Sequence, residues 1–109
     1  MSEFKTVYLA GKITGDPNYR GKFERAAMEL ERSGYIVLNP ALLPPAGFEY
    51  AAYMRMSRAM LDECEAICLL PDWTESAGAL DEYPRSISLG IRAFEYADWA
   101  NEQERMVTT

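Results

Sequence analysis

The segment TVYLAGKITGDP, residues 6–17, contains the local pattern that decides the fold. Its first five residues, Thr6–Ala10, are apolar or β-branched and predict a buried strand. A glycine-containing loop follows, and Asp16-Pro17 near its end is the expected start of a helix, because aspartate caps helices and proline suits their first turn. A strand, a short loop and a helix in this order form the first unit of a parallel sheet.

The same alternation continues along the rest of the chain. The first helix is expected to bury one face, whose apolar residues lie three and four positions apart, and to end near Gly34. That face consists of Phe23, Ala26, Ala27 and Leu30. Further strands are expected at residues 35–38, 66–70 and 91–96, and further helices at 49–64 and 77–89. The pattern predicts a small doubly wound α/β fold, Rossmann-like or flavodoxin-like, with a parallel sheet of four to five strands and helices on both faces.

The length of 109 residues fits a single domain, which we expect to span residues 1–96. Residues 97–109 are largely polar, and we expect a short helix that frays into a disordered tail. The sequence shows no signal peptide and no run of about 18 apolar residues. We therefore expect a cytoplasmic protein without a membrane partner.

Charge and histidine content exclude several classes of function. The chain has 11 basic and 17 acidic residues, a net charge of −6 and no basic cluster, so binding to nucleic acid is not expected. It has no histidine, which excludes every mechanism that needs imidazole. Two cysteines are too few for a structural zinc site, and we expect Cys64 and Cys68 to be buried thiols in a reducing compartment. We expect neither a metal nor a cofactor.

In doubly wound sheets, ligands bind beyond the carboxyl ends of the strands. In the first loop at that end, Gly11 and Gly15 allow backbone N–H groups to approach an anion closely. The loop matches neither a P-loop nor a dinucleotide fingerprint, and an ordinary strand-to-helix turn explains it equally well. The loops that this rule selects are residues 11–17, 39–48 and 72–78.

The third of these loops is followed by a carboxylate at the same end of the sheet. Ser76 is expected to cap the next helix, and Glu82 lies in the first turns of that helix. In a pocket beside Tyr8 and Trp73, a glutamate can act as a nucleophile or a base. The alternative is that Glu75, Asp81 and Glu82 form a solvated acidic turn at the start of the helix, which favours the helix dipole.

The second helix carries more apolar residues than one contact with the sheet requires. We expect its Met54 and Met60 to lie in the core. Tyr50 and Tyr53 add to a soft apolar surface, so a homo-oligomer, a dimer or larger, is a second use of this helix.

Three segments together resemble the nucleoside 2-deoxyribosyltransferase superfamily, and the similarity extends to the deoxynucleoside 5′-monophosphate N-glycosidases. They are YLAGKITG (8–15), GYIVLNP (34–40) and WTESAGALDE (73–82). The most similar subgroup consists of small, often phage-borne, members. The motifs that carry the resemblance are a Ser-x-Gly-x-x-x-Glu spacing and a Tyr-x-x-Gly strand end, and the similarity covers roughly residues 6–94.

The resemblance implies cleavage of the N-glycosidic bond of a nucleoside or its 5′-monophosphate, so the expected partner is a small molecule. Glu82 matches the catalytic glutamate, which attacks the anomeric carbon and forms an ester that water or a second base displaces. Tyr8 matches the tyrosine that orients this carboxylate. The expected substrate-binding residues are Gly11, Lys12, Ile13, Thr14, Asn39, Ser57, Trp73, Ser76 and Gly78, of which Ser76 and Gly78 match a phosphate-binding loop.

Two departures from the family pattern keep a second function open. Ser57 stands where the family usually has an aspartate on the second helix. Pro84 lies two residues after Glu82, and we expect it either to move the helix start toward Tyr83 or to bend the helix. The sequence is compatible with an enzyme, with a sensor or sequestering protein that binds a nucleotide in the same cleft, and with an oligomeric interaction protein.

Overall fold

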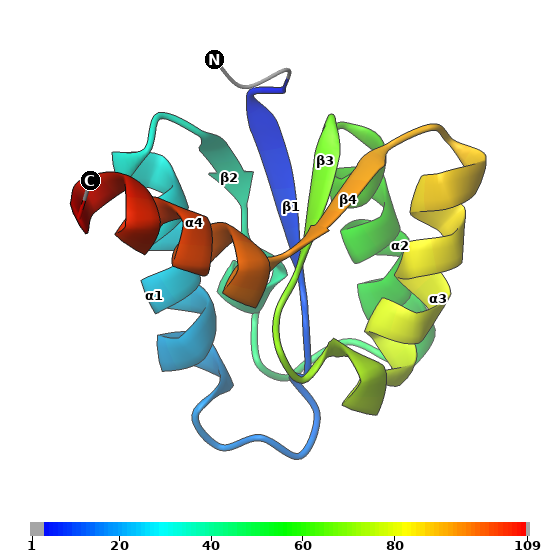
Figure 1. Cartoon of the computed structure of the whole chain (residues 1–109). Coiled ribbons are helices and arrows are strands. Elements are labelled where there is room, and N and C mark those ends of the chain that lie inside the picture. The colour runs from blue at the N-terminus through cyan, green and yellow to red at the C-terminus, as the bar shows by residue number, and fades with distance from the viewer. Residues whose placement is uncertain (1–3, 109) are drawn as a thin grey trace.

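The computed structural model describes residues 4–108, and for residues 106–108 the backbone only. Within this range the strands form one parallel, four-stranded sheet with the order β2-β1-β3-β4 (Figure 1). Tyr8 on β1 pairs with Leu38 on one side and with Ile67 on the other. The strands are β1 (Thr6–Ala10), β2 (Ile36–Leu38), β3 (Ala66–Leu69) and β4 (Arg92–Glu95). The predicted parallel sheet is confirmed.

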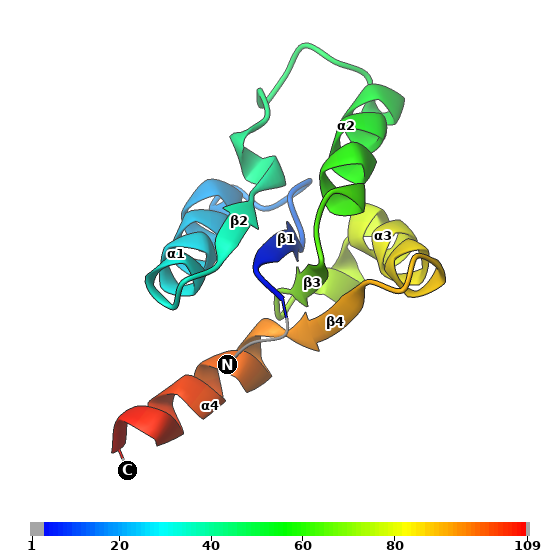
Figure 2. The ribbon, with the colours of Figure 1, turned by 90° about the horizontal axis from the view of Figure 1, so that it is seen from above.

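Helices cover both faces of this sheet, as a doubly wound fold requires. Viewed along the sheet, α1 and α4 lie on one face and α2 and α3 on the other (Figure 2). The helices are α1 (Tyr19–Arg32), α2 (Tyr50–Asp62), α3 (Ala77–Ser88) and α4 (Tyr96–Thr108), with short 3₁₀ turns η1 (Pro40–Leu42) and η2 (Trp73–Glu75).

Strand β1 supplies side chains to both halves of the core. Val7 and Leu9 pack into the cluster that contains Phe23 and Leu30 of α1. The alternating residues Tyr8 and Ala10 face the other cluster, with Leu61 of α2 and Ala79 of α3. Because side chains of a strand alternate between faces, one strand contributes to the core under α1 and to the core under α2 and α3.

Both cysteines are buried free thiols, as expected, and burial raises the pKa of Cys64 to about 11 and that of Cys68 to about 12. These thiols are therefore packing groups and poor nucleophiles at neutral pH.

The predicted start of the first helix was wrong. Helix α1 begins at Tyr19, and its cap residue Asn18 makes no capping hydrogen bond through its side chain. Asp16 has other partners: it accepts a hydrogen bond from the backbone N–H of Asn18 at 2.9 Å and one from Nζ of Lys22 at 2.7 Å. An ion pair with the helix therefore replaces the expected cap.

The C-terminal segment is more regular than expected. A 13-residue helix, α4, replaces the short fraying helix that its polar composition suggested. Tyr96 and Trp99 lie three residues apart and pack against the core cluster on the α1 side, and this contact outweighs the polar composition. The part of the tail prediction that falls on Thr109 lies outside the described residues, and the division of the chain near residue 96 stays a prediction.

Candidate active site

A pocket of about 170 Å³ lies at the carboxyl end of β1, between the loop after β2, helix α2 and the start of α3. The chain leaves β1 toward α1 and leaves β3 toward α3 on the opposite face, so the connections diverge at this point. Such a divergence leaves a crevice, which is the usual ligand site of doubly wound sheets. The predicted site residues that line the pocket are Tyr8, Gly11, Ile13, Thr14, Ser57, Ser76, Gly78 and Glu82.

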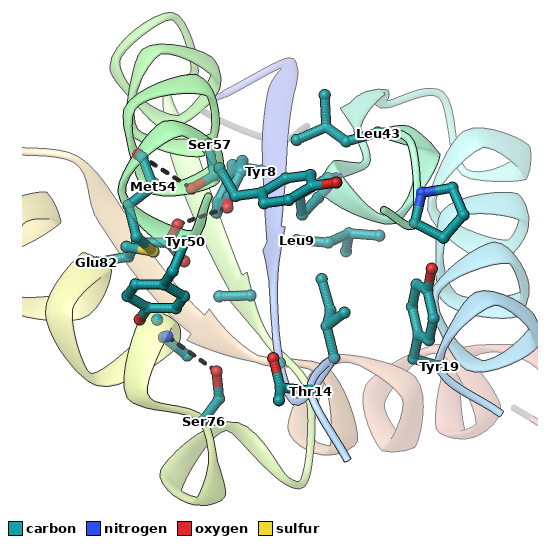
Figure 3. Close-up of a pocket in the computed structure, with 18 of the residues that line it drawn as sticks. Tyr8, Leu9, Thr14, Tyr19, Leu43, Tyr50, Met54, Ser57, Ser76 and Glu82 are labelled. Carbon is teal, nitrogen blue, oxygen red and sulfur yellow. Dashed lines mark hydrogen bonds between the residues drawn. The ribbon is translucent and has the colours of Figure 1, made fainter. Parts of the chain in front are cut away.

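The central contact is between the two predicted catalytic residues. The phenol of Tyr8 donates a hydrogen bond of 2.7 Å to Oε2 of Glu82 (Figure 3). Glu82 is 4% exposed and Tyr8 is 1% exposed. The alternative that Glu82 belongs to a solvated acidic turn is therefore wrong, although its neighbour Asp81 is exposed and pairs with Arg58 at 2.9 Å. Successive helix residues differ by about 100° in direction, which separates the two carboxylates.

The surroundings of Glu82 change its acidity. Burial raises the pKa of its carboxyl above the usual value, and the hydrogen bond from Tyr8 partly opposes this rise. Burial and the adjacent Glu82 charge raise the pKa of Tyr8 well above the usual value for tyrosine. Tyr8 therefore keeps its proton at neutral pH and remains the donor.

Ser57 lies on α2 beside this pair and is 7% exposed. Its hydroxyl donates to the carbonyl of Met54 at 3.3 Å. The side chain is short, so α2 approaches Tyr8 and Glu82 closely without adding a second carboxylate.

Helix α3 runs through Pro84 from Ala77 to Ser88. The helix start near Tyr83, one of the two expected effects of Pro84, is therefore wrong. Pro84 has no N–H to donate to the carbonyl four residues earlier, and it is exposed. Ser86, one turn from Glu82, is fully buried and donates to the carbonyl of Tyr83. The proline thus occupies the outer side of the helix, while Glu82 occupies the inner side.

The first residues of α3 form one end of the pocket. Ser76 caps the helix by accepting a hydrogen bond of 3.1 Å from the N–H of Ala79, as predicted. Gly78 follows, and a Cβ there would lie 3.4 Å from the sulfur of Met54. The helix start therefore packs closely on α2, and its residues Ser76 and Gly78 line the pocket.

The loop after β1 forms the floor of the site. A Cβ on Gly11 would lie only 2.9 Å from Cβ of Leu70, so only glycine allows β1 and the end of β3 to come this close. Ile13 and Thr14 follow and line the pocket.

Three predicted substrate-binding residues do not line the pocket. The N–H of Lys12 donates to Asp72 at 3.0 Å, and its Nζ lies 3.6 Å from Glu75. The side chain of Asn39 is turned into η1, where it accepts a hydrogen bond from Ala41. Trp73 packs against Tyr83, with ring centroids 5.1 Å apart.

Sequence reasoning missed several residues that do line the pocket. Tyr19 begins α1, and Tyr50 and Tyr53 belong to the first turn of α2, where they were read as apolar members of a helix. The loop before α2 also contributes Leu43 and two prolines, Pro44 and Pro45. The position of this loop after a strand was the signal in the sequence that could have identified these residues, because loops at the carboxyl ends of the strands surround the same crevice.

Within the described part of the chain, no three histidine, cysteine, aspartate or glutamate side chains gather as metal ligands would. None of the described helices has the length and apolar character needed to cross a membrane.

Comparison with a solved structure identifies the class of fold. A 2-desoxiribosyltransferase from Leishmania mexicana matches this chain with a TM-score of 0.66 and 19% sequence identity, over 84% of this chain and 63% of that one. The chain thus spans less than two thirds of that protein, and it has a nucleoside 2-deoxyribosyltransferase-like fold, as the sequence motifs implied. It belongs to the family described as a domain of unknown function (DUF4406), whose model matches residues 5–94. No curated protein matches the sequence.

Proposed function

We propose that this protein cleaves the N-glycosidic bond of a nucleoside or nucleoside 5′-monophosphate, or transfers the sugar to another base, with Glu82 as nucleophile. The observation that carries this proposal is the buried Glu82 carboxylate, held by Tyr8 and lining a pocket at the carboxyl ends of the strands. The shared fold supports the reaction class.

In the first step, an oxygen of Glu82 bonds to the anomeric carbon while the bond from that carbon to the base nitrogen breaks. The electron pair leaves with the base, and a glycosyl ester remains on the protein. In the second step, water or another base attacks the same carbon and releases the carboxylate. A carboxylate suits both steps because positive charge develops on the sugar in each transition state.

Tyr8 positions this nucleophile and sets its protonation. Its hydrogen bond fixes one oxygen of Glu82 and lowers the pKa of the carboxyl relative to burial alone. A buried carboxyl without such a donor stays protonated to higher pH and is then a poor nucleophile.

The direct test is release of free base from a panel of deoxynucleosides and their 5′-monophosphates, followed by chromatography. Glu82→Gln keeps the size of the side chain and is expected to abolish release, whereas Asp81→Asn changes the neighbouring, exposed carboxylate and is expected to retain it. Mass spectrometry of acid-quenched protein is expected to find a sugar adduct on the peptide that contains Glu82. Equal release by the parent and Glu82→Gln excludes Glu82 as the nucleophile.

The second candidate is a protein that binds a nucleotide in the same cleft without turnover. Ser57 favours it, because the described lining holds one carboxylate where two are usual in glycosidases. A thermal-shift panel of nucleosides, monophosphates and cyclic nucleotides distinguishes it: a shift without base release supports binding alone. For either function we propose a cytoplasmic protein that forms a homo-oligomer, which light scattering tests.

A further inference from the structure

The charges around the pocket are unevenly distributed. Among the described residues that line it, Glu82 is the single carboxylate, and none is a lysine or an arginine. Arg58, on α2 near Glu82, pairs with Asp81 outside the pocket at 2.9 Å. Once Glu82 is ionised, no cationic side chain of the lining balances its charge.

Two cationic side chains near the pocket, those of Arg20 and Lys12, interact with other groups of the protein. Nε of Arg20 donates to the phenol oxygen of Tyr19 at 3.0 Å, and its terminal nitrogen lies 3.4 Å from the carbonyl of Leu43. Lys12 pairs with the exposed Glu75. These groups remain outside the lining, so the field inside the pocket is dominated by Glu82.

Aromatic rings add to the preference for positive charge. Tyr50 and Tyr53 line the pocket, as does Tyr19, whose ring already lies under the guanidinium of Arg20 at 5.7 Å from the ring centroid. In Figure 3, Tyr50 lies on the same side as Glu82, and Tyr19 lies on the opposite side. The face of a tyrosine ring is the negative part of its quadrupole and attracts a cation that stacks on it.

The chemistry of the departing base also favours a substrate whose base is positively charged. A neutral base departs as an anion unless an acid protonates it, and a glycosidase normally supplies that acid from a second carboxyl. Apart from Glu82, the described lining offers hydroxyls, a thioether and hydrocarbon groups, and the hydroxyl of Tyr8 is already engaged in its hydrogen bond to Glu82. A base that is already cationic departs as a neutral molecule and needs no acid.

We propose, building on the function above, that the preferred substrates are N-glycosides with a cationic base, namely pyridinium or N7-alkylated purine nucleosides. Glu82 bonds to the anomeric carbon, the carbon–nitrogen bond breaks, and its electron pair neutralises the ring of the departing base. Water then attacks the anomeric carbon, Glu82 leaves as a carboxylate, and one proton passes to the solvent.

The end of the pocket at the start of α3 does not oppose the preference for a cationic base. Of the two lining residues at the start of α3, Ser76 already donates its N–H to the carbonyl of Trp73, and the N–H of Gly78 suits an oxygen of the sugar or of a 5′-substituent. The inference concerns the charge of the base and holds for a nucleoside and for its 5′-monophosphate.

The test uses pairs of substrates that differ by one methyl group and one positive charge. Release of base from 7-methylguanosine is compared with release from guanosine, and the 2′-deoxy pair is compared in the same way, with spontaneous cleavage subtracted. We expect kcat/KM to be at least about tenfold higher for the methylated member. Equal or faster cleavage of the neutral member overturns the inference and leaves the proposed function intact. No release from either member beyond the rate of Glu82→Gln overturns both.

Binding provides a readout that does not depend on turnover. The probes are 1-methylnicotinamide, which is cationic, and nicotinamide, which is neutral. The parent protein and Glu75→Gln, which removes an exposed carboxylate outside the lining, are expected to bind the cation more tightly. Glu82→Gln is expected to bind both probes equally. If Glu82→Gln retains the preference, or if the parent shows none, the carboxylate does not select the cation and the inference is wrong.

Discussion

Two groups of carboxylates lie near the carboxyl ends of the strands, and they differ in how their charge is balanced. Asp16 and Asp72 share the ammonium group of Lys22, which also donates to the carbonyl of Lys12 at 2.8 Å. All three side chains are about one quarter exposed. Glu82 is more deeply buried, and it accepts a hydrogen bond from the neutral phenol of Tyr8.

The pKa values of Asp16 and Glu82 are shifted in opposite directions. Hydrogen bonding to Lys22 lowers the pKa of Asp16, whereas burial raises that of Glu82. Burial alone would lower the pKa of Lys22, but its bonds to Asp16 and Asp72 raise it overall. The charge-balanced cluster of Lys22, Asp16 and Asp72 holds together the loops after β1 and β3. Glu82 has no cationic partner in the pocket lining and remains available for chemistry.

The largest expected effect comes from removing the unbalanced charge. Glu82→Gln is expected to reduce kcat for base release by about 10³-fold or more, because the amide is not a nucleophile. The measurement is steady-state release of base at saturating substrate. Activity within tenfold of the parent would show that Glu82 is not the reacting group.

Tyr8→Phe tests whether the phenol sets the acidity of Glu82. We expect kcat/KM to fall about 10- to 100-fold, and the acid limb of its pH profile to move to higher pH. The direction follows because loss of the hydrogen bond removes a contribution that lowers the pKa of Glu82. Tyr83→Phe is the control, since Tyr83 packs nearby without lining the pocket. An unmoved acid limb would assign the phenol a packing role alone.

Lys22→Met tests the balanced cluster. It removes the cation that Asp16 and Asp72 share, and we expect the free energy of unfolding to fall by about 1–2 kcal/mol. The expected change in kcat/KM is small, because Lys22 does not line the catalytic pocket. Urea unfolding is compared with that of Arg25→Met, an exposed position on the same helix. Equal midpoints for the two variants would show that the cluster does not stabilise the fold.

The smallest expected effect is on the pH dependence of stability. Since folding raises the pKa of Glu82, the protonated carboxyl favours the folded state, and this contribution is lost as pH rises through the folded-state value. Glu82→Gln does not titrate, so its melting temperature is expected to gain on that of the parent with rising pH, by roughly a few degrees. If the melting temperature of Glu82→Gln instead falls relative to that of the parent as pH rises, the pKa of Glu82 is not raised by folding.

The strand pattern and the motif spacing predicted much of this molecule. Continuous apolar runs such as Thr6–Ala10 determine a buried parallel strand almost without help from the rest of the chain. Glu82 and Tyr8 were paired in advance by the family resemblance, and the structure brings them to 2.7 Å.

Other parts depend on tertiary contacts that no local pattern encodes. The backbone N–H of Lys12 donates to Asp72, which lies 60 residues away in the sequence. Tyr19 and Tyr53 reach the pocket only because α1 and α2 begin at its edge. For such residues the sequence spacing predicts which face of the helix they occupy. It does not predict which parts of the protein their side chains contact.

Strand β1 alternates between the two halves of the core, and this links folding to chemistry. Deleting one residue from the strand would reverse every later position: the phenol of Tyr8 would be directed into the apolar layer beneath α1, and an aliphatic side chain would face Glu82. An insertion or deletion in this strand therefore alters the surroundings of the nucleophile and the packing of the core together, whereas the loops and helix α2 contribute lining residues that lie outside the strand.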